Sequence, residues 1–115
     1  MITRIPGKVA TRSRAVATDK LVFTVSVATE KSPSLYEQTK SALAALDQNL
    51  ADARSNKSHI LSATVYVTDM ALKAEMNRAW DEWVDLAHPP QRACVGVALE
   101  GDDLVEIVVT ALRAR

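Results

Sequence analysis

Glycine, histidine and cysteine are scarce in this sequence, and each shortage excludes a class of site. The 3 glycines lie too far apart to form a loop that cradles a phosphate, which excludes P-loop and Rossmann nucleotide binding. The 2 histidines and the single cysteine show no HxxxH or CxxC spacing, so we predict neither a metal ion nor a cofactor. No G-x-S-x-G stretch is present to hold a serine nucleophile.

Neither sign of charge is in excess, because 14 lysines and arginines balance 14 aspartates and glutamates. This balance argues against bulk binding of nucleic acid. The longest uninterrupted apolar run, residues 42–46, is far shorter than the roughly 20 residues that a membrane span needs. The lone Cys94 cannot form an internal disulfide, which fits a reducing compartment. We therefore expect one cytoplasmic domain over residues 1–115, with no membrane partner and with nucleic acid disfavoured as a partner.

Alternation of apolar and polar side chains predicts the first strands. The period-two pattern covers residues 20–27, and the stretch 8–17, rich in β-branched and small residues, is expected to pair with it across a turn. The same alternation predicts a further strand over residues 60–68.

Two amphipathic helices are expected between the strands. Ser34, followed three residues later by Glu37, forms a capping box that starts a helix with apolar residues every three to four positions, up to the polar stretch 55–58. Asp69 can cap a second helix, which cannot continue through the proline pair at 89–90.

The last segment is predicted to be a hairpin of two strands, 92–99 and 104–112, joined by a glycine-containing loop. In the expected register Arg92, Cys94 and Glu106 share one face. The order of elements predicts an α+β domain in which two helices cover one face of a mixed sheet.

The face that the helices leave uncovered is expected to be partly apolar. Its predicted apolar members are Val22, Tyr66 and Val108, with Leu104 and Leu112 beside them. An exposed apolar patch of this kind usually marks an interface. We therefore expect an oligomer in which sheets meet back to back, with a cleft between chains that can hold a site.

Arg92, Cys94 and Glu106 are the candidate residues of that cleft. A strand arginine presents a planar fork that binds a carboxylate through two parallel hydrogen bonds, which implies a small acidic ligand. Glu106 on a neighbouring strand can orient or deprotonate a water molecule. Cys94 is expected to be a wall residue, because no histidine is placed to activate its thiol. The alternative is that Arg92 and Glu106 form a structural ion pair at a subunit interface.

The most specific motif is Pro-x-Arg-x-Cys-Val-x-Val at residues 90–97, followed by Val-Glu-Ile at residues 105–107. With these motifs, and with the stretches SNKSHILSATVYVTDM and MNRAWDEWV before them, the chain resembles the RidA/YjgF reactive intermediate deaminase family, especially its YoaB-like branch. The resemblance implies a chorismate-mutase-like fold with a mixed six-stranded sheet, a homotrimer with clefts between subunits, and hydrolysis of 2-imino or enamino acids to 2-oxo acids and ammonia.

The resemblance also implies roles for single residues. The arginine that matches Arg92 holds the substrate carboxylate in that family, and the residues that match Cys94 and Asn77 lie at the cleft. The glutamate that matches Glu106 helps to place the attacking water, which makes Glu106 the expected catalytic residue.

Two stretches depart from the family's pattern. Archetypal members carry Gly-Pro-Tyr before the first long strand and Ser-Gly-Gln after it, whereas this chain has residues 11–13 and 25–27 at the corresponding places, reading Thr-Arg-Ser and Val-Ser-Val. The aromatic wall that the tyrosine supplies is therefore missing. Arg12 or Arg14 is a possible replacement at the cleft, and either would favour a more acidic ligand.

Two other functions compete with the deaminase interpretation. One is a nonenzymatic trimer that binds a small 2-imino or 2-oxo acid as a sensor or regulator. The other is binding or cleavage of RNA, for which the basic residues before position 21 are the only support and against which the lack of an aromatic platform argues.

Overall fold

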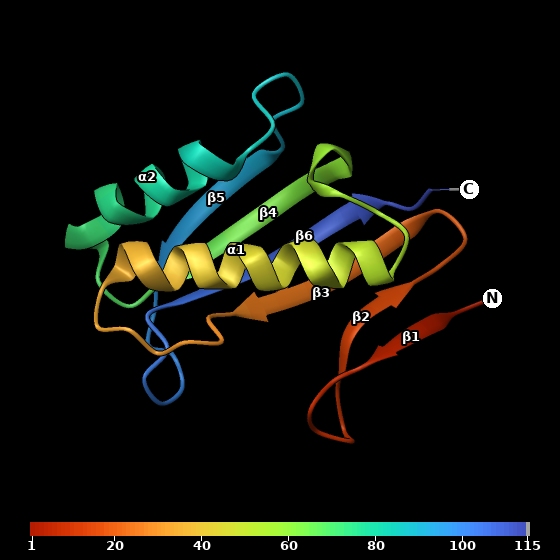
Figure 1. Ribbon diagram of the computed structural model, residues 1–115, viewed down its shortest axis with the longest axis horizontal. Helices are drawn as coiled ribbons and strands as arrows, with labels where there is room; N and C mark the ends of the chain where they lie inside the picture. The colour runs from red at the N-terminus through yellow and green to blue at the C-terminus, as the bar shows by residue number, and fades with distance from the viewer. Residues whose placement is uncertain (115) are drawn as a thin grey trace.

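The computed structural model describes residues 1–114 and contains a single six-stranded sheet with two α-helices (Figure 1). The strands are β1 (Thr3–Pro6), β2 (Ser13–Ala17), β3 (Leu21–Val27), β4 (Ile60–Val67), β5 (Gln91–Gly96) and β6 (Val105–Leu112). The helices are α1 (Leu35–Asp52) and α2 (Lys73–Trp83), and short 3-10 turns, η1 (Lys57–His59) and η2 (Met70–Leu72), precede β4 and α2. No helix within residues 1–114 is long and apolar enough to cross a membrane.

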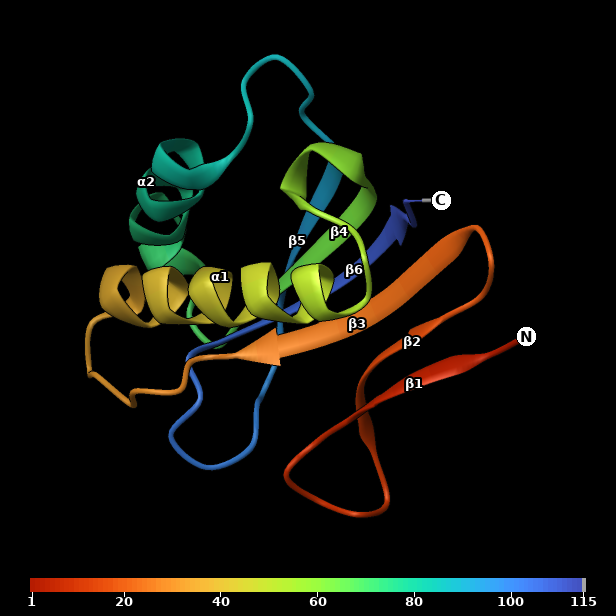
Figure 2. The ribbon, with the colours of Figure 1, turned by 45° about the vertical axis from the view of Figure 1, so that its right-hand side comes forward.

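The strand order in the sheet is β1-β2-β3-β6-β4-β5, and only β4 and β5 pair in parallel. The chain passes from β3 through α1 to β4, and then from β4 through α2 to β5, always toward the same edge. Because such crossovers are almost always right-handed, both helices come to lie on the same side of the sheet (Figure 2). The predicted α+β class, with a mixed sheet and two helices on one face, is confirmed.

The core lies between the helices and one face of the sheet, called here the covered face. Leu43, Leu46 and Leu50 of α1 are fully buried against Val65 and Ile107 of the sheet. The helix starts as predicted, because the Ser34 hydroxyl accepts a hydrogen bond from the Glu37 N–H at 3.2 Å. Asp69 caps η2 through the Ala71 N–H, so α2 begins one turn later than the sequence indicated.

The predicted strand over residues 8–17 is wrong in its first half. Residues 13–17 form β2, which pairs with β3 as predicted, but residues 8–12 connect β2 to a further strand, β1, on its other side. An added Cβ at Gly7 would lie 2.8 Å from the Arg12 carbonyl oxygen, so the chain turns too tightly there for a longer strand.

The predicted hairpin of the last two strands is also wrong, because β4 lies between β5 and β6. Burial explains the order: alternate residues of β4 are buried, whereas β5 has no buried residue and suits an edge. The turn residues near Gly101 allow the chain to reverse, but they do not determine which strands pair.

The other face of the sheet, called here the open face, carries the large apolar side chains that neither helix covers. These are Phe23, Val25, Val95, Val108 and Leu112, each between 39% and 45% exposed. The half-buried Tyr66 lies among them, level with Val95 and Glu106. The prediction of an apolar uncovered face is therefore confirmed for Tyr66, Val108 and Leu112.

Val22 and Leu104 do not belong to the open face. Val22 is fully buried opposite Ala111 on the covered face, and Leu104 packs against the core. In β3 the less apolar set of alternating residues faces the helices, and the more apolar set faces outward. A rule that places the more apolar side of a strand inward therefore assigned Val22 to the wrong face.

Candidate functional site

Arg92 lies on edge strand β5, level with Ala63 of β4, on the covered face beside α2. Its side chain is half-buried, and its Nη2 donates a hydrogen bond to Oδ1 of Asn77 at 2.8 Å. The guanidinium carbon lies 5.3 Å from the centroid of the Trp80 ring. Asn77 and Trp80 stand one turn apart on α2, so one helix face supports the guanidinium. No carboxylate of residues 1–114 forms an ion pair with Arg92, which leaves its charge uncompensated.

Cys94 follows two residues later on the same face of β5. Its Sγ lies 3.9 Å from Sδ of Met70 in η2. The glycine at position 96 allows this approach, because a Cβ there would lie 2.6 Å from Cγ of Met70. Cys94 has a thioether neighbour, and its thiol forms no hydrogen bond with a base within residues 1–114, which fits a wall residue. Arg92, Asn77 and Cys94 therefore lie on the same side of the sheet, and they are called here the arginine half-site.

Glu106 lies on the opposite side of the sheet from the arginine half-site. It pairs in register with Val27 and Tyr66 on the open face. The expectation that Arg92, Cys94 and Glu106 share one face is wrong within one chain. It depended on a β5–β6 pairing that the intervening β4 prevents.

Glu106 lines a cavity of about 310 Å³, called here the glutamate pocket. The pocket lies between the connection of β1 to β2, the end of β3, and the segment before β6. Its lining residues used below are Lys8, Arg12, Arg14, Ser26, Glu100 and Asp103. Both candidate arginines therefore lie with Glu106, not with Arg92.

Arg14 is occupied by contacts with its own chain. Its guanidinium donates to the Pro6 carbonyl at 2.9 Å, to Oδ1 of Asn49 at 2.7 Å, and to Oδ2 of Asp52 at 2.9 Å. The hydrogen bond from Arg14 is the main reason why the pKa of the Asp52 carboxyl is lowered. Arg12 is exposed, and its side chain has no hydrogen bond or ion pair with any residue that the structure describes. Of the two arginines, Arg12 is the one available to a ligand.

Ser26 is a residue of this pocket that the sequence analysis did not select. It is 5% exposed, and its hydroxyl has no hydrogen-bond partner among residues 1–114. The hydroxyl lies on the covered face of the sheet, in register with Ile107, so it offers no hydrogen bond to a ligand beside Glu106 on the open face. The available signal was the pair of polar residues, Thr24 and Ser26, that alternate on one side of this strand.

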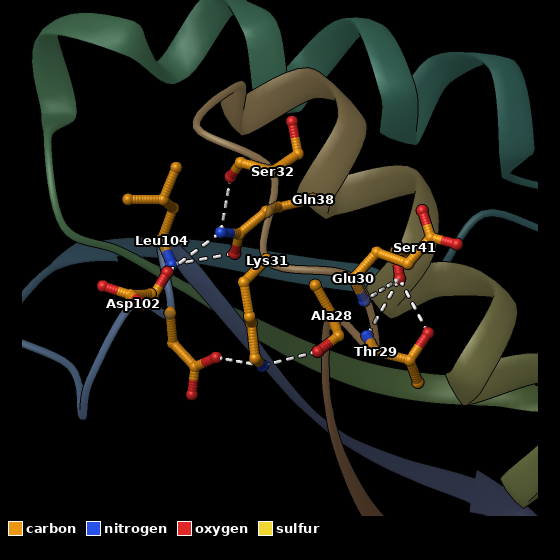
Figure 3. A network of polar contacts seen from close by, with 10 residues as sticks. Ala28, Thr29, Glu30, Lys31, Ser32, Gln38, Ser41, Asp102 and Leu104 are labelled. Atoms are coloured by element: carbon orange, nitrogen blue, oxygen red, sulfur yellow. Dashed lines mark hydrogen bonds and ion pairs between the residues drawn. The ribbon is translucent and has the colours of Figure 1, made fainter.

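A polar network holds the segment that leads into β6 (Figure 3). The buried Gln38 side chain donates to the carbonyls of Ser32 at 2.8 Å and Asp102 at 2.9 Å, and it accepts from the Leu104 N–H at 2.9 Å. Lys31 forms an ion pair with Asp103 and donates to the Ala28 carbonyl. These contacts tie the β3–α1 connection to the start of β6, two residues before Glu106.

A second cluster, Ser58, Asp85 and His88, lies near the end of α2 and does not form a catalytic triad. Asp85 accepts hydrogen bonds from the Ser58 hydroxyl at 2.6 Å and from Nδ1 of His88 at 2.9 Å. The bond from Ser58 contributes most to lowering the pKa of Asp85 to about 2. In a triad the serine bonds to the histidine, whereas here both bond to the same carboxylate, so Ser58 is not activated. No group of three or more His, Cys, Asp or Glu side chains in the described part of the chain is arranged to hold a metal ion.

The fold, with an arginine at the sheet's edge and a glutamate on its open face, belongs to the class of α+β proteins called YjgF. A YjgF family protein from Neisseria meningitidis aligns with a TM-score of 0.94 and 36% identity, over 100% of this chain and 97% of that one. The family model described as Endoribonuclease L-PSP matches residues 3–113. This chain therefore belongs to the RidA/YjgF family.

Two curated relatives agree with this assignment. A RutC family protein from Haemophilus ducreyi is 42% identical over 112 residues, which cover 96% of each chain. The RutC family protein YoaB of Escherichia coli is 43% identical over 77 residues, covering 66% of this chain and 68% of that one. The predicted resemblance to the YoaB-like branch of the family is therefore confirmed.

Proposed function

We propose that this protein hydrolyses reactive 2-imino or enamino acids to 2-oxo acids and ammonia, at sites formed between the subunits of a homotrimer. One observation carries the proposal: two charged groups without an ion-pair partner in residues 1–114, Arg92 and Glu106, lie on opposite faces of the sheet. Arg92 is held by a neutral amide with its charge free, and Glu106 lines a cavity across the sheet. A second copy of the chain is required to bring the two together.

The open face supplies the reason for the copies to associate. Its exposed apolar side chains surround Glu106, so sheets that meet through this face bury the apolar surface and enclose the glutamate pocket. Burial of apolar area contributes roughly 25 cal/mol per Å², which makes such a patch a strong driving force for association. The edge strand that carries Arg92 then reaches the neighbouring subunit's pocket.

Each charged group has a distinct role in the proposed reaction. The guanidinium of Arg92 binds the substrate carboxylate through two parallel N–H···O bonds, with Asn77 holding the arginine in place. The protonated imine carbon then lies beside a water molecule that Glu106 orients. Because the substrate and the water molecule are already held together, their loss of translational freedom occurs on binding and does not add to the barrier of the chemical step.

The proton balance requires one acid–base group. Water adds to the iminium carbon while Glu106 accepts its proton, and the C=N electron pair moves to nitrogen. Glu106 returns that proton to the nitrogen of the carbinolamine and then takes the hydroxyl proton as the C–N bond breaks. The products are the 2-oxo acid, ammonia and a proton, so the mechanism uses no metal ion or redox cofactor.

Release of ammonia from freshly generated imines tests the proposal. Imines produced from several amino acids by an amino-acid oxidase should release ammonia faster with the protein than in buffer, and Arg92→Ala should remove this acceleration. Binding of 2-oxo acids without any turnover would instead support the ligand-binding trimer. If Arg92→Ala dissociates the oligomer, the alternative of a structural ion pair between Arg92 and Glu106 is correct.

A further inference from the structure

The glutamate pocket holds positive charge that the proposed reaction does not use. Of its charged lining residues, Arg14 is paired with Asp52, and Asp103 is paired with Lys31. Lys8 and Arg12, on the connection between β1 and β2, form no ion pair with any other residue within 1–114. Two cations therefore face the same cavity as Glu106 with their charges free.

Beside this pocket, the end of β3 has no strand neighbour on one side among residues 1–114. The pairing of β2 with β3 ends at Ala15 and Thr24, whereas β3 continues to Val27. The edge of β3 beyond Thr24 thus lacks a strand neighbour on that side, and the pocket occupies the gap. Ser26 lies in this stretch and lines the pocket, but its buried hydroxyl is on the covered face of the sheet.

The lining groups of the pocket that have no ion-pair partner in the described chain include two cationic hydrogen-bond donors, Lys8 and Arg12. A guanidinium and an ammonium beside one small cavity bind anionic oxygens through short charge-assisted hydrogen bonds. The pocket has three acidic lining residues. Asp103 is paired with Lys31, Glu106 acts on the reacting carbon in the proposed function, and Glu100 has no ion-pair partner in residues 1–114. The volume of about 310 Å³ is near the lower limit of ligand pockets, which suits a small organic acid.

We propose that the preferred substrate is a 2-imino acid with a second, acidic group, whose side-chain carboxylate binds to Arg12 and Lys8. This inference rests on the proposed function for the position of the reacting carbon. Each charged group of the substrate then has a partner. The first carboxylate binds Arg92 of one subunit, the iminium lies at Glu106 of the next, and the second carboxylate binds Arg12 and Lys8. A monocarboxylic imine leaves Arg12 and Lys8 without a partner.

Binding of stable 2-oxo acids tests the inference independently of turnover. Isothermal titration of the intact protein should show 2-oxoglutarate bound at least about tenfold more tightly than 2-oxobutanoate, since a hydrogen bond to a charged group is worth that much or more. Arg12→Ala, and more fully the double change Arg12→Ala with Lys8→Ala, should abolish the preference. Arg4→Ala is the matched control, because Arg4 is an exposed arginine of the same segment and does not line the pocket; it should retain the preference.

Turnover measured in parallel separates the two proposals. Ammonia release from the imines of glutamate and alanine should show the same preference in kcat/KM. If neither imine is hydrolysed but the binding preference is found and lost in Arg12→Ala, the acidic subsite stands and the deaminase proposal fails. If both imines are hydrolysed with equal efficiency and both 2-oxo acids bind equally, the deaminase proposal stands and the subsite is refuted. A preference that survives the double change, or no binding of either acid, also refutes it.

Discussion

Replacing Arg92 by lysine tests whether the arginine acts through its geometry or only through its charge. Lysine keeps the positive charge but offers one ammonium point instead of a planar fork, so one of two hydrogen bonds to the substrate carboxylate is lost. A hydrogen bond to a charged group is worth about 1.5–3 kcal/mol, which corresponds to a loss of roughly 10- to 150-fold in affinity. The contact with Asn77, at 2.8 Å in the wild type, is also lost or rebuilt. Titration with pyruvate or 2-oxobutanoate should therefore show Arg92→Lys weaker than wild type by roughly 10- to 150-fold, with Arg92→Ala weaker still.

A matched control exists on the same helix. Arg78 of α2 stacks on the ring of Tyr36 at 3.6 Å, away from the site, so Arg78→Lys makes the same chemical change beside another aromatic ring. This variant should bind 2-oxo acids like the wild type, and thermal melting should show that both lysine variants are folded. Wild-type affinity in Arg92→Lys would refute the two-pronged carboxylate site and reduce Arg92 to a source of charge.

Three further predictions concern the reaction, the assembly and the stability of the chain. Glu106→Gln should lower the rate of imine hydrolysis by about 100- to 10,000-fold with 2-oxo acid binding retained, whereas Cys94→Ala should cost much less; full turnover in Glu106→Gln would disprove water activation. Val108→Asp should give monomers in light scattering, because it puts a charge at the centre of the open face, and an unchanged oligomer would show that this face is not the interface. Because the pKa of Asp85 is about 2 in the folded chain and ordinarily 3.8, its carboxylate stabilises the fold above pH 4, and this contribution is lost as the pH falls through 2. The difference in urea stability between wild type and Asp85→Asn should therefore disappear toward pH 2, and a constant difference would contradict the assignment.

Local patterns predicted the elements that depend on neighbouring residues in the chain. The start of α1 at Ser34 follows from a cap that satisfies a free backbone N–H, and the alternation in β3 and β4 follows from the two faces of a strand. The side-by-side placement of Arg92 and Cys94 needed only their spacing of two residues. The motif at residues 90–97 also lies within one short stretch of the chain, so the family could be recognised from the sequence.

Long-range pairing could not be read from such patterns. Insertion of β4 between β5 and β6 depends on which strand buries most apolar surface in the assembled sheet, and it separates Glu106 from Arg92. The outward orientation of Phe23 and Val25 departs from the rule that apolar residues face the core, and alternation alone does not tell which of the two faces of β3 the helices cover. The cavity at Ser26 likewise arises from a pairing of β2 with β3 that ends early.

Mixed oligomers of Arg92→Ala and Glu106→Gln test most directly whether each site takes its arginine from one chain and its glutamate from the next. The two variants should each be inactive alone. When equal amounts are unfolded together and refolded, about one quarter of the intersubunit sites should receive both intact residues, and imine hydrolysis should recover to about one quarter of the wild-type rate. If mixing, verified by mass spectrometry of differently tagged chains, restores no activity, the composite site between subunits is contradicted.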